Sequence, residues 1–292
     1  GLTTGGAAYC WGANPYGQLG DGTPSTFARS SPVAVSGGLV FQAISASMYY
    51  STCALTTGGA AYCWGDNVAG QLGDGSMSGR TSPVVVAGGL VFQAISAGTT
   101  YACGLTTGGA AYCWGNNSYG QLGDSTTSHR TSPAVVSGGL VFQSISAGDH
   151  HGCGLTTGGA AYCWGYNNSG QLGDGTTGNR SSPVGVSGGL LFQAIGGGFS
   201  HTCGVTMGGA AHCWGYNNYG QLGDGTTSIP PHSSPVAVSG SLLFQAINAG
   251  TWHTCALTAG GAAYCWGSNN SGQLGDGTTT FNRSTPVAVL SP

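Results

Sequence analysis

Short apolar stretches alternate with glycine-rich turns along the whole chain, and the alternation recurs at a nearly constant interval. One copy contains four such stretches, at 92–96 (FQAIS), 102–106 (ACGLT), 110–115 (AAYCWG) and 132–136 (SPAVV). Their β-branched and aromatic residues, and the glycines between them, favour strands over helices. Short loops join the first three stretches, which favours antiparallel neighbours. Each copy is therefore predicted to form four strands, named a, b, c and d in chain order.

A Cys-Trp-Gly triplet marks each of six copies, at Trp11, Trp64, Trp114, Trp164, Trp214 and Trp266. The intervals are 53, 50, 50, 50 and 52 residues. Four-stranded antiparallel units repeating at this interval are typical of a β-propeller. A β-solenoid is the alternative, but its coils are usually shorter and lack hairpins. We predict an all-β chain: a single β-propeller domain over 1–292, with four-stranded blades in a six- or seven-bladed ring.

The first copy lacks strand a, whereas the chain ends after a strand d, so the two ends do not complement each other. We expect either that the chain is a segment of a longer polypeptide or that a neighbouring molecule supplies the missing strand. Each strand d also contains a proline, which suits the first residue of an edge strand. These prolines are Pro32, Pro83, Pro133, Pro183, Pro235 and Pro286.

The cysteines repeat with strands b and c. Folding CALTTGGAAYC about a Thr57-Gly58-Gly59 loop places Cys53 directly opposite Cys63, within disulfide range. Equivalent pairs are Cys103/Cys113, Cys153/Cys163, Cys203/Cys213 and Cys255/Cys265. Five such disulfides would indicate an oxidising, extracellular or cell-surface location. Reduced core cysteines are the alternative, and the spacing does not favour zinc. Cys10 has no partner in this register and is expected to be free or bonded to another molecule.

The motif AAYCWGxNxxGQLGDG, followed by a proline-containing strand and FxxIxAGxxHTCxLT, resembles the repeat of the regulator of chromosome condensation family. The resemblance covers nearly the whole chain and implies a propeller that is usually seven-bladed. It does not select a function, because the family includes a chromatin-bound nucleotide exchange factor, a plant ultraviolet-B photoreceptor and a secreted bacterial β-lactamase inhibitor. The chain lacks the basic contacts of the first and the Gly-Trp-Arg-His-Thr repeats of the second, so neither role is favoured.

Charge is scarce: the chain has no lysine and no glutamate, and five arginines stand against eight aspartates. No basic stripe is available to neutralise nucleic-acid phosphates or to attach the chain to anionic membranes. No apolar run approaches the length of a membrane span. We therefore expect neither nucleic-acid binding nor membrane insertion.

Three histidines share one repeat position, two residues before the cysteine of strand b: His151, His201 and His253. They predict either a metal or ligand site or, more simply, a recurring hydrogen bond that fixes the a-to-b turn. The QLGDG aspartates offer one carboxylate per copy, which suits turn capping better than calcium binding. The Cys-Trp-Gly tryptophans are expected to pack between blades. No catalytic constellation is recognisable, so we expect no enzyme, metal or cofactor.

The copies differ mainly in the loop before strand d and in the a-to-b turn. The turn is rich in aromatic and histidine residues, which suits a contact face. The candidate contact residues are Tyr49, Tyr50, Tyr101, His150, His151, Phe199, His201, Trp252 and His253. Asn-x-Ser sequons in the polar loops are candidate glycosylation sites. They begin at Asn116, Asn167, Asn179, Asn269 and Asn282.

Near-identical blades and low charge favour an extracellular structural or adhesive module of a cell-surface or filamentous assembly, which associates with itself or with another extracellular protein. The alternative is a secreted protein-binding propeller, such as an enzyme inhibitor, that uses the aromatic a-to-b turns. Self-association into fibres would favour the first function, and a stable monomer would favour the second.

Overall fold

The computed structural model describes residues 1–290, and within that range the chain forms twenty-two β-strands and no helix. The described part therefore contains no helix that could cross a membrane. Residues 291 and 292, which the predicted domain includes, lie outside the described residues. The all-β fold predicted from the sequence is confirmed.

The chain divides into two compact units, Gly1–Ala147 and Gly148–Pro292. The strands of the first unit are β1 (Tyr9–Asn14), β2 (Ser25–Ala34), β3 (Phe41–Ala46), β4 (Ser51–Thr56), β5 (Ala61–Gly65), β6 (Arg80–Val85), β7 (Phe92–Ala97), β8 (Tyr101–Thr106), β9 (Ala111–Gly115), β10 (Arg130–Val135) and β11 (Phe142–Ala147).

The second unit contains β12 (His151–Thr156), β13 (Ala161–Gly165), β14 (Arg180–Gly185), β15 (Phe192–Gly197), β16 (His201–Thr206), β17 (Ala211–Gly215), β18 (His232–Ala237), β19 (Phe244–Ala249), β20 (His253–Thr258), β21 (Ala263–Gly267) and β22 (Arg283–Ala288).

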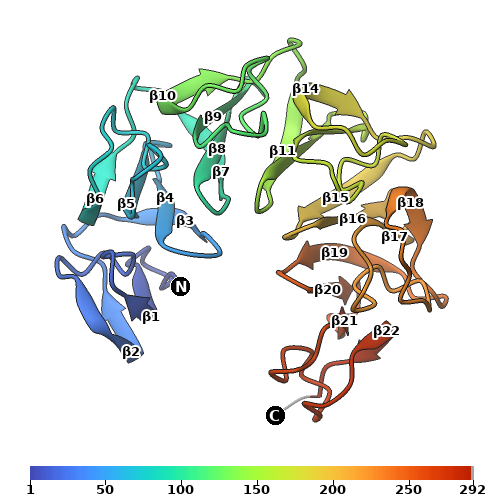
Figure 1. Cartoon of the computed structure of the whole chain (residues 1–292). Helices are drawn as coiled ribbons and strands as arrows, with labels where there is room; N and C mark the ends of the chain where they lie inside the picture. Colours follow the sequence, from blue (N-terminus) through green and yellow to red (C-terminus); the bar gives the residue numbers. More distant parts are fainter. Residues whose placement is uncertain (291–292) are drawn as a thin grey trace. The chain divides into compact units, whose positions relative to one another are not determined.

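Consecutive strands form four-stranded antiparallel sheets, as the repeat predicts (Figure 1). In the first unit, β3-β4-β5-β6 and β7-β8-β9-β10 are complete sheets, and β1 pairs with β2. In the second unit, β15-β16-β17-β18 and β19-β20-β21-β22 are complete, and β12, β13 and β14 are neighbours in the same order. Strands a to d of one copy thus correspond to β7 to β10, with ends within two residues of the predicted ones.

The prolines of strand d were predicted at the first residue of the strand, but they lie inside it. Strand β10 begins at Arg130, which pairs with Gly115, and Pro133 falls in the register shift before Ala134. The expectation that proline is the first residue of the strand is therefore wrong. A bulge in an edge strand tolerates proline, because the missing N–H has no ladder acceptor there.

The b-to-c hairpin has the predicted three-residue loop. The Thr56 N–H donates to the Ala60 carbonyl (3.0 Å), and the Gly59 N–H returns to the Thr56 carbonyl (2.9 Å). Gly59 has a φ of +79°, and a Cβ there would lie 2.7 Å from Val91 Cγ1. Glycine is required at this position both by the backbone conformation and by the close approach of the next copy.

The hydrophobic core lies between neighbouring sheets. In the first unit, Leu55 and Leu72 of one copy pack with Phe92 and Trp114 of the next, and all four are buried. In the second unit, Val205 and Leu222 pack in the same way with residues of the following copy, Phe244 and Trp266 among them. Within each unit, these neighbouring sheets therefore bury apolar faces against each other.

Candidate functional site

Five disulfides join strands b and c, and each pair of α-carbons lies 4.0 or 4.1 Å apart. They are Cys53–Cys63, Cys103–Cys113, Cys153–Cys163, Cys203–Cys213 and Cys255–Cys265. In every pair the two cysteines are direct cross-strand partners, as for Cys53 and Cys63. The five predicted pairs are confirmed, and each one links two strands of the same sheet.

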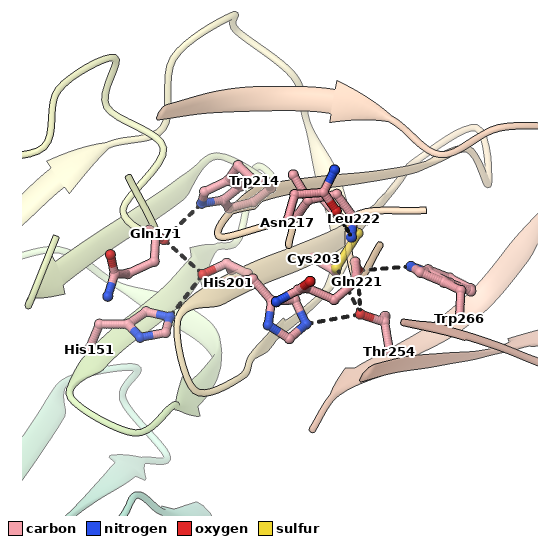
Figure 2. Close-up of a disulfide and its surroundings, with 12 residues drawn as sticks. His151, Gln171, His201, Cys203, Trp214, Asn217, Gln221, Leu222, Thr254 and Trp266 are labelled. Atoms are coloured by element: carbon pink, nitrogen blue, oxygen red, sulfur yellow. Dashed lines mark hydrogen bonds between the residues drawn. A yellow bond between two sulfur atoms is a disulfide. The ribbon is translucent and has the colours of Figure 1, made fainter. Parts of the chain in front are cut away.

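A chain of polar contacts joins neighbouring sheets in the second unit (Figure 2). The Gln171 carbonyl accepts from Trp214 Nε1 (2.9 Å) and from the Thr202 hydroxyl (2.8 Å). His151 Nε2 lies 2.8 Å from the same hydroxyl. Because Thr202 gives its single proton to Gln171, its oxygen accepts from His151, and His151 carries its proton on Nε2. The His151 ring, the Thr202 hydroxyl and the backbone carbonyl of Gln171 therefore form one directed chain of hydrogen bonds.

The same arrangement recurs one copy later. His201 Nε2 lies 2.9 Å from Thr254 Oγ1, and Thr254 donates to the Gln221 carbonyl (2.9 Å), which also accepts from Trp266 Nε1 (3.0 Å). In the first unit, Trp64 and Trp114 donate to the equivalent carbonyls of Gln18 and Gln71. The predicted packing of these four tryptophans between blades is confirmed, whereas Trp11 is 56% exposed.

The histidines serve a structural contact that differs from the predicted one. The backbone carbonyl of His151, not its ring, closes the a-to-b turn by accepting from Gly148 N (2.9 Å), while the ring bonds to the next copy. Burial lowers the pKa of His151 and of His201 to about 3, so both rings are neutral. Within the described residues, no cluster of three metal-ligating side chains occurs. The absence of a metal stays a prediction.

Three of the candidate contact residues are not at the surface. Tyr101, His151 and His201 are fully buried, so their assignment to a contact face is wrong. They are the first residues of strands β8, β12 and β16, and the rings of His151 and His201 bond to the next copy instead of facing outward. The remaining candidates are partly or well exposed: Tyr49, Tyr50, His150, Phe199, Trp252 and His253.

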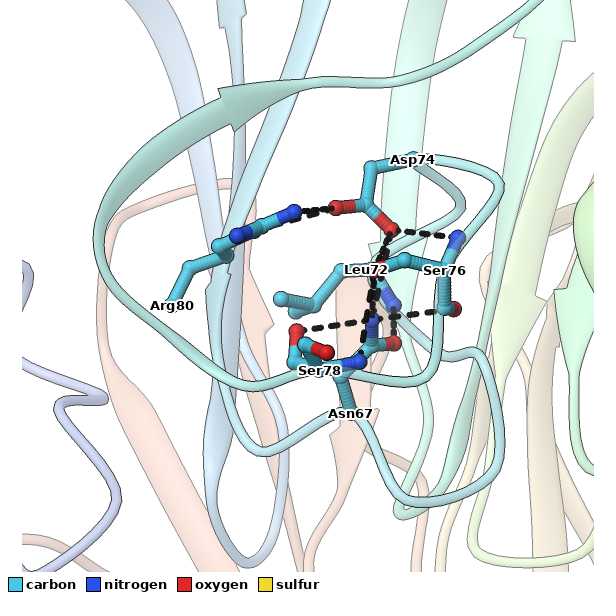
Figure 3. A network of polar contacts seen from close by, with 6 residues as sticks. All are labelled: Asn67, Leu72, Asp74, Ser76, Ser78 and Arg80. Atoms are coloured by element: carbon cyan, nitrogen blue, oxygen red, sulfur yellow. Dashed lines mark hydrogen bonds and ion pairs between the residues drawn. The ribbon is translucent and has the colours of Figure 1, made fainter.

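The QLGDG aspartates cap their own loops, as expected (Figure 3). Asp74 Oδ1 accepts from the backbone N–H (2.9 Å) and the hydroxyl (2.7 Å) of Ser76. Asp74 Oδ2 accepts from Arg80 (2.9 Å). In the same loop, the Leu72 N–H donates to Asn67 Oδ1. Burial raises the pKa of Asp74, but the bonds from Ser76 and Arg80 outweigh it and lower the pKa overall. The arginine had not been assigned a role, although its spacing from the aspartate repeats.

Aromatic side chains gather at the a-to-b turns of each unit. In the first unit, Tyr50 lies 4.6 Å from Tyr16 and 5.7 Å from Tyr49 between ring centroids. A groove of about 300 Å³ beside them is also lined by Asp66, Val68, Thr99 and Thr100. Tyr16 was not predicted as a contact residue. It precedes the GQLG motif of the first copy, and the aromatic residue at that position is the signal that could have identified it.

In the second unit, Trp252 is the centre of a four-ring cluster. Its ring lies 4.7 Å from Phe199, 5.4 Å from Tyr216 and 5.6 Å from Tyr219. All four residues are partly exposed. The two tyrosines come from the loop that follows Cys-Trp-Gly, so the cluster combines both loops. Sequence reasoning identified Phe199 and Trp252 and missed Tyr216 and Tyr219.

Two of the predicted glycosylation sites are inaccessible. Asn167 and Asn269 are fully buried, and their amide nitrogens donate to Asp174 and Asp276. Their assignment as acceptors is wrong, because the glycan is attached to that nitrogen. Asn179 and Asn282 are exposed, and Asn116 is half-buried. Glycosylation at these three stays a prediction.

Cys10 is a free cysteine on β1, opposite Val33 of β2. Burial raises the pKa of its thiol. It lines a groove of about 410 Å³ together with Tyr9, Trp11 and Ile44. An intermolecular bond at Cys10 stays a prediction.

Comparison with known proteins identifies the fold and the family. The RCC1-like domain model matches residues 1–291. The human E3 ubiquitin-protein ligase HERC2 is 38% identical over 86 residues, which are 30% of this chain and 2% of that protein. Human WBSCR16 has a TM-score of 0.86 at 21% identity, over 97% of this chain and 78% of the other.

Yeast RCC1 (Prp20), solved bound to Kap60, has a TM-score of 0.86 at 20% identity, over 99% of this chain and 72% of the other. Together with the repeated four-stranded sheets, these structures confirm the predicted β-propeller fold. The repeat motif, the sheet order and the match along the chain agree: this chain belongs to the RCC1-like domain family.

Proposed function

We propose that this chain is an extracellular, disulfide-stapled propeller that binds another protein through its aromatic a-to-b turns. The cluster of Phe199, Tyr216, Tyr219 and Trp252 is the observation that carries the proposal. Large, rigid aromatic rings supply contact area at a low cost in side-chain entropy, and they dominate the binding energy of many protein interfaces. The geometry favours this function over the structural or adhesive one.

The five disulfides support an extracellular or cell-surface location. Structural disulfides persist in oxidising compartments and are rare where glutathione and thioredoxin keep thiols reduced. All five are largely or fully buried between strands, where reductants have poor access. A secreted protein-binding propeller is consistent with such an oxidising location.

Similar propellers support a protein partner. Yeast Prp20 was solved with Kap60, and its binding to Gsp1p and histones is described. Those partners belong to Prp20, and only the use of this fold for protein recognition is carried over to our proposal. A binding role rather than a catalytic one also agrees with the use of the aspartates, whose carboxylates cap loops and pair with arginines.

The test is retention of proteins from the extracellular medium of the producing organism on immobilised chain. Trp252→Ala is expected to lose at least one retained protein, because it removes the ring that contacts the other three. Val141→Ala is the matched control, since Val141 is 52% exposed but belongs to no aromatic cluster. Equal retention by both variants would contradict the proposal.

The structural or adhesive function remains a second candidate, on the evidence of exposed apolar residues in strand β2 and in the loops before β18 and β22. Phe27 is 81% exposed, Ile229 80% and Phe281 67%. With so few charges, such side chains favour association between copies. Light scattering after gel filtration separates the candidates: a monomer over a wide concentration range supports protein binding, and concentration-dependent growth that Phe27→Ser and Ile229→Ser abolish supports self-assembly.

A further inference from the structure

Asp66 differs from every other aspartate of the chain. All eight aspartates lie within residues 1–290, and seven of them approach an arginine or histidine to within 4 Å: Asp21, Asp74, Asp124, Asp149, Asp174, Asp224 and Asp276. Asp66 has no cationic neighbour in this range. Its Oδ2 accepts from Gln71 Nε2 (2.9 Å), and Oδ1 has no hydrogen-bond partner among the described residues. One carboxylate of the first unit therefore carries an unpaired charge.

This carboxylate lines the groove formed by the three tyrosines. Tyr16, Tyr49 and Tyr50 are 47%, 51% and 38% exposed, so part of each ring is accessible to a ligand in the groove. Thr99 and Thr100 also line the groove, but the Thr100 hydroxyl oxygen is buried. The groove thus combines aromatic surface with one free carboxylate oxygen.

We propose that this groove binds an arginine side chain of a partner protein, with the guanidinium against Asp66 and a tyrosine ring. The inference rests on the proposed protein-binding function and specifies the chemistry of one contact. A guanidinium stacks on aromatic rings and presents five donors, so it can pair with Asp66 Oδ1 while its flat face lies against a tyrosine ring. A lysine ammonium matches the charge but lacks the flat face.

The arginine comes from a different protein rather than from a second copy of this chain. Each of the five arginines here already pairs with an aspartate of its own loop: Arg29, Arg80, Arg130, Arg180 and Arg283. Releasing one of them would leave its aspartate without its cation. The net charge of -3 also favours a basic partner.

The next copy shows which uncharged residue can replace Asp66. Asn116 occupies the position of Asp66, and Gln121 Nε2 donates to its Oδ1 (3.0 Å) just as Gln71 donates to Asp66. Asp66→Asn therefore removes the charge while it keeps the loop hydrogen bond. Asp66→Asn combined with Asn116→Asp restores the net charge in a different copy, which separates a local carboxylate from a general electrostatic effect.

Calorimetry with the peptide acetyl-Gly-Arg-Gly-amide tests the inference, with citrulline and lysine peptides for comparison. Asp66→Asn is expected to weaken binding of the arginine peptide about fivefold or more, and the charge-restored double variant to bind as weakly. Replacement by citrulline, which keeps the shape without the charge, is expected to weaken binding to a similar extent. Tyr50→Leu is expected to weaken it too.

Equal binding of the arginine and citrulline peptides, or unchanged binding by Asp66→Asn, would overturn the inference. A lysine peptide that binds as tightly as the arginine peptide would overturn the role of the planar guanidinium. The retention assay with Trp252→Ala tests the proposed function separately, because Trp252 lies in another cluster. If the groove binds the arginine peptide but the immobilised chain retains no protein, the proposed function is refuted and the arginine site still stands.

Discussion

At the scale of single residues, one threonine hydroxyl in each of two contacts of the second unit determines which ring nitrogen of a histidine carries the proton. Thr202 and Thr254 donate to backbone carbonyls, so the histidines that meet them donate from Nε2, and burial keeps both rings neutral. The Nδ1 atom of His201 is buried and has no hydrogen-bond partner within the structure. Buried neutral histidines that must gain a charge on unfolding make stability depend on pH.

We predict that the chain loses stability as the pH falls below about 6.5, the unfolded pKa of histidine. The folded pKa of His151 and His201 is about 3, so between these values the unfolded state binds more protons. Stability is therefore fully present above pH 6.5 and is lost as the pH falls toward 3, by about 1.4 kcal/mol per pH unit for each histidine.

Urea unfolding at pH 7, 6 and 5 measures this slope. His201→Gln removes one titrating group, so its stability is expected to fall less steeply with acid than that of the wild type, whatever its stability at pH 7. Parallel curves for the two proteins would show that His201 does not titrate on unfolding.

At the scale of the element, the b-to-c hairpin contains two adjacent glycines with different roles. Gly59 has positive φ and touches the next copy, whereas a Cβ on Gly58 would meet nothing within 4 Å. The sequence pattern Gly-Gly does not distinguish them. Only the left-handed backbone and the contact with Val91 and Phe92 make one of the two irreplaceable.

Gly59→Ala is therefore expected to destabilise the chain by about 1–3 kcal/mol, because the substitution combines backbone strain with a Cβ 2.8 Å from the Phe92 carbonyl oxygen. Gly58→Ala, the matched control, is expected to be neutral or to stabilise slightly, since it restricts the unfolded chain. Thermal unfolding of the two variants side by side measures the difference. Similar losses in both would contradict the assignment.

At the scale of the whole molecule, the same short staple recurs five times, so its contribution is distributed over both units. Each bridge closes a loop between cysteines ten residues apart. In the chain-entropy model a loop of this length contributes roughly 2–3 kcal/mol. The stability of the chain is therefore linked to an oxidising environment.

We expect reduction under mild denaturation to lower the unfolding midpoint and to add two hydrogens per bridge to the intact mass. The Cys203→Ala and Cys213→Ala double variant is expected to lower the midpoint by only part of this shift. Cys10→Ser is the control and is expected to leave it unchanged. An oxidised wild type that unfolds like its reduced form would remove the stability argument for an extracellular location.

The sequence by itself determined the strands, their order and the five disulfides of this protein. These follow from local patterns: apolar runs separated by glycine turns, and a hairpin short enough to place Cys53 opposite Cys63 without further information. The free Cys10 and the loop-capping role of Asp74 follow from the repeat in the same way.

Only the tertiary structure decided which residues of different copies meet. His151 bonds to Thr202, and Tyr16 stacks on Tyr50, across separations of 51 and 34 residues. The repeat period predicts that copies are equivalent, but not how far one is displaced against the next. Tyr101 is buried and Tyr50 is at the surface, although they occupy adjacent positions of the repeat. Packing between sheets, rather than the pattern along one strand, sets which side chains face each other.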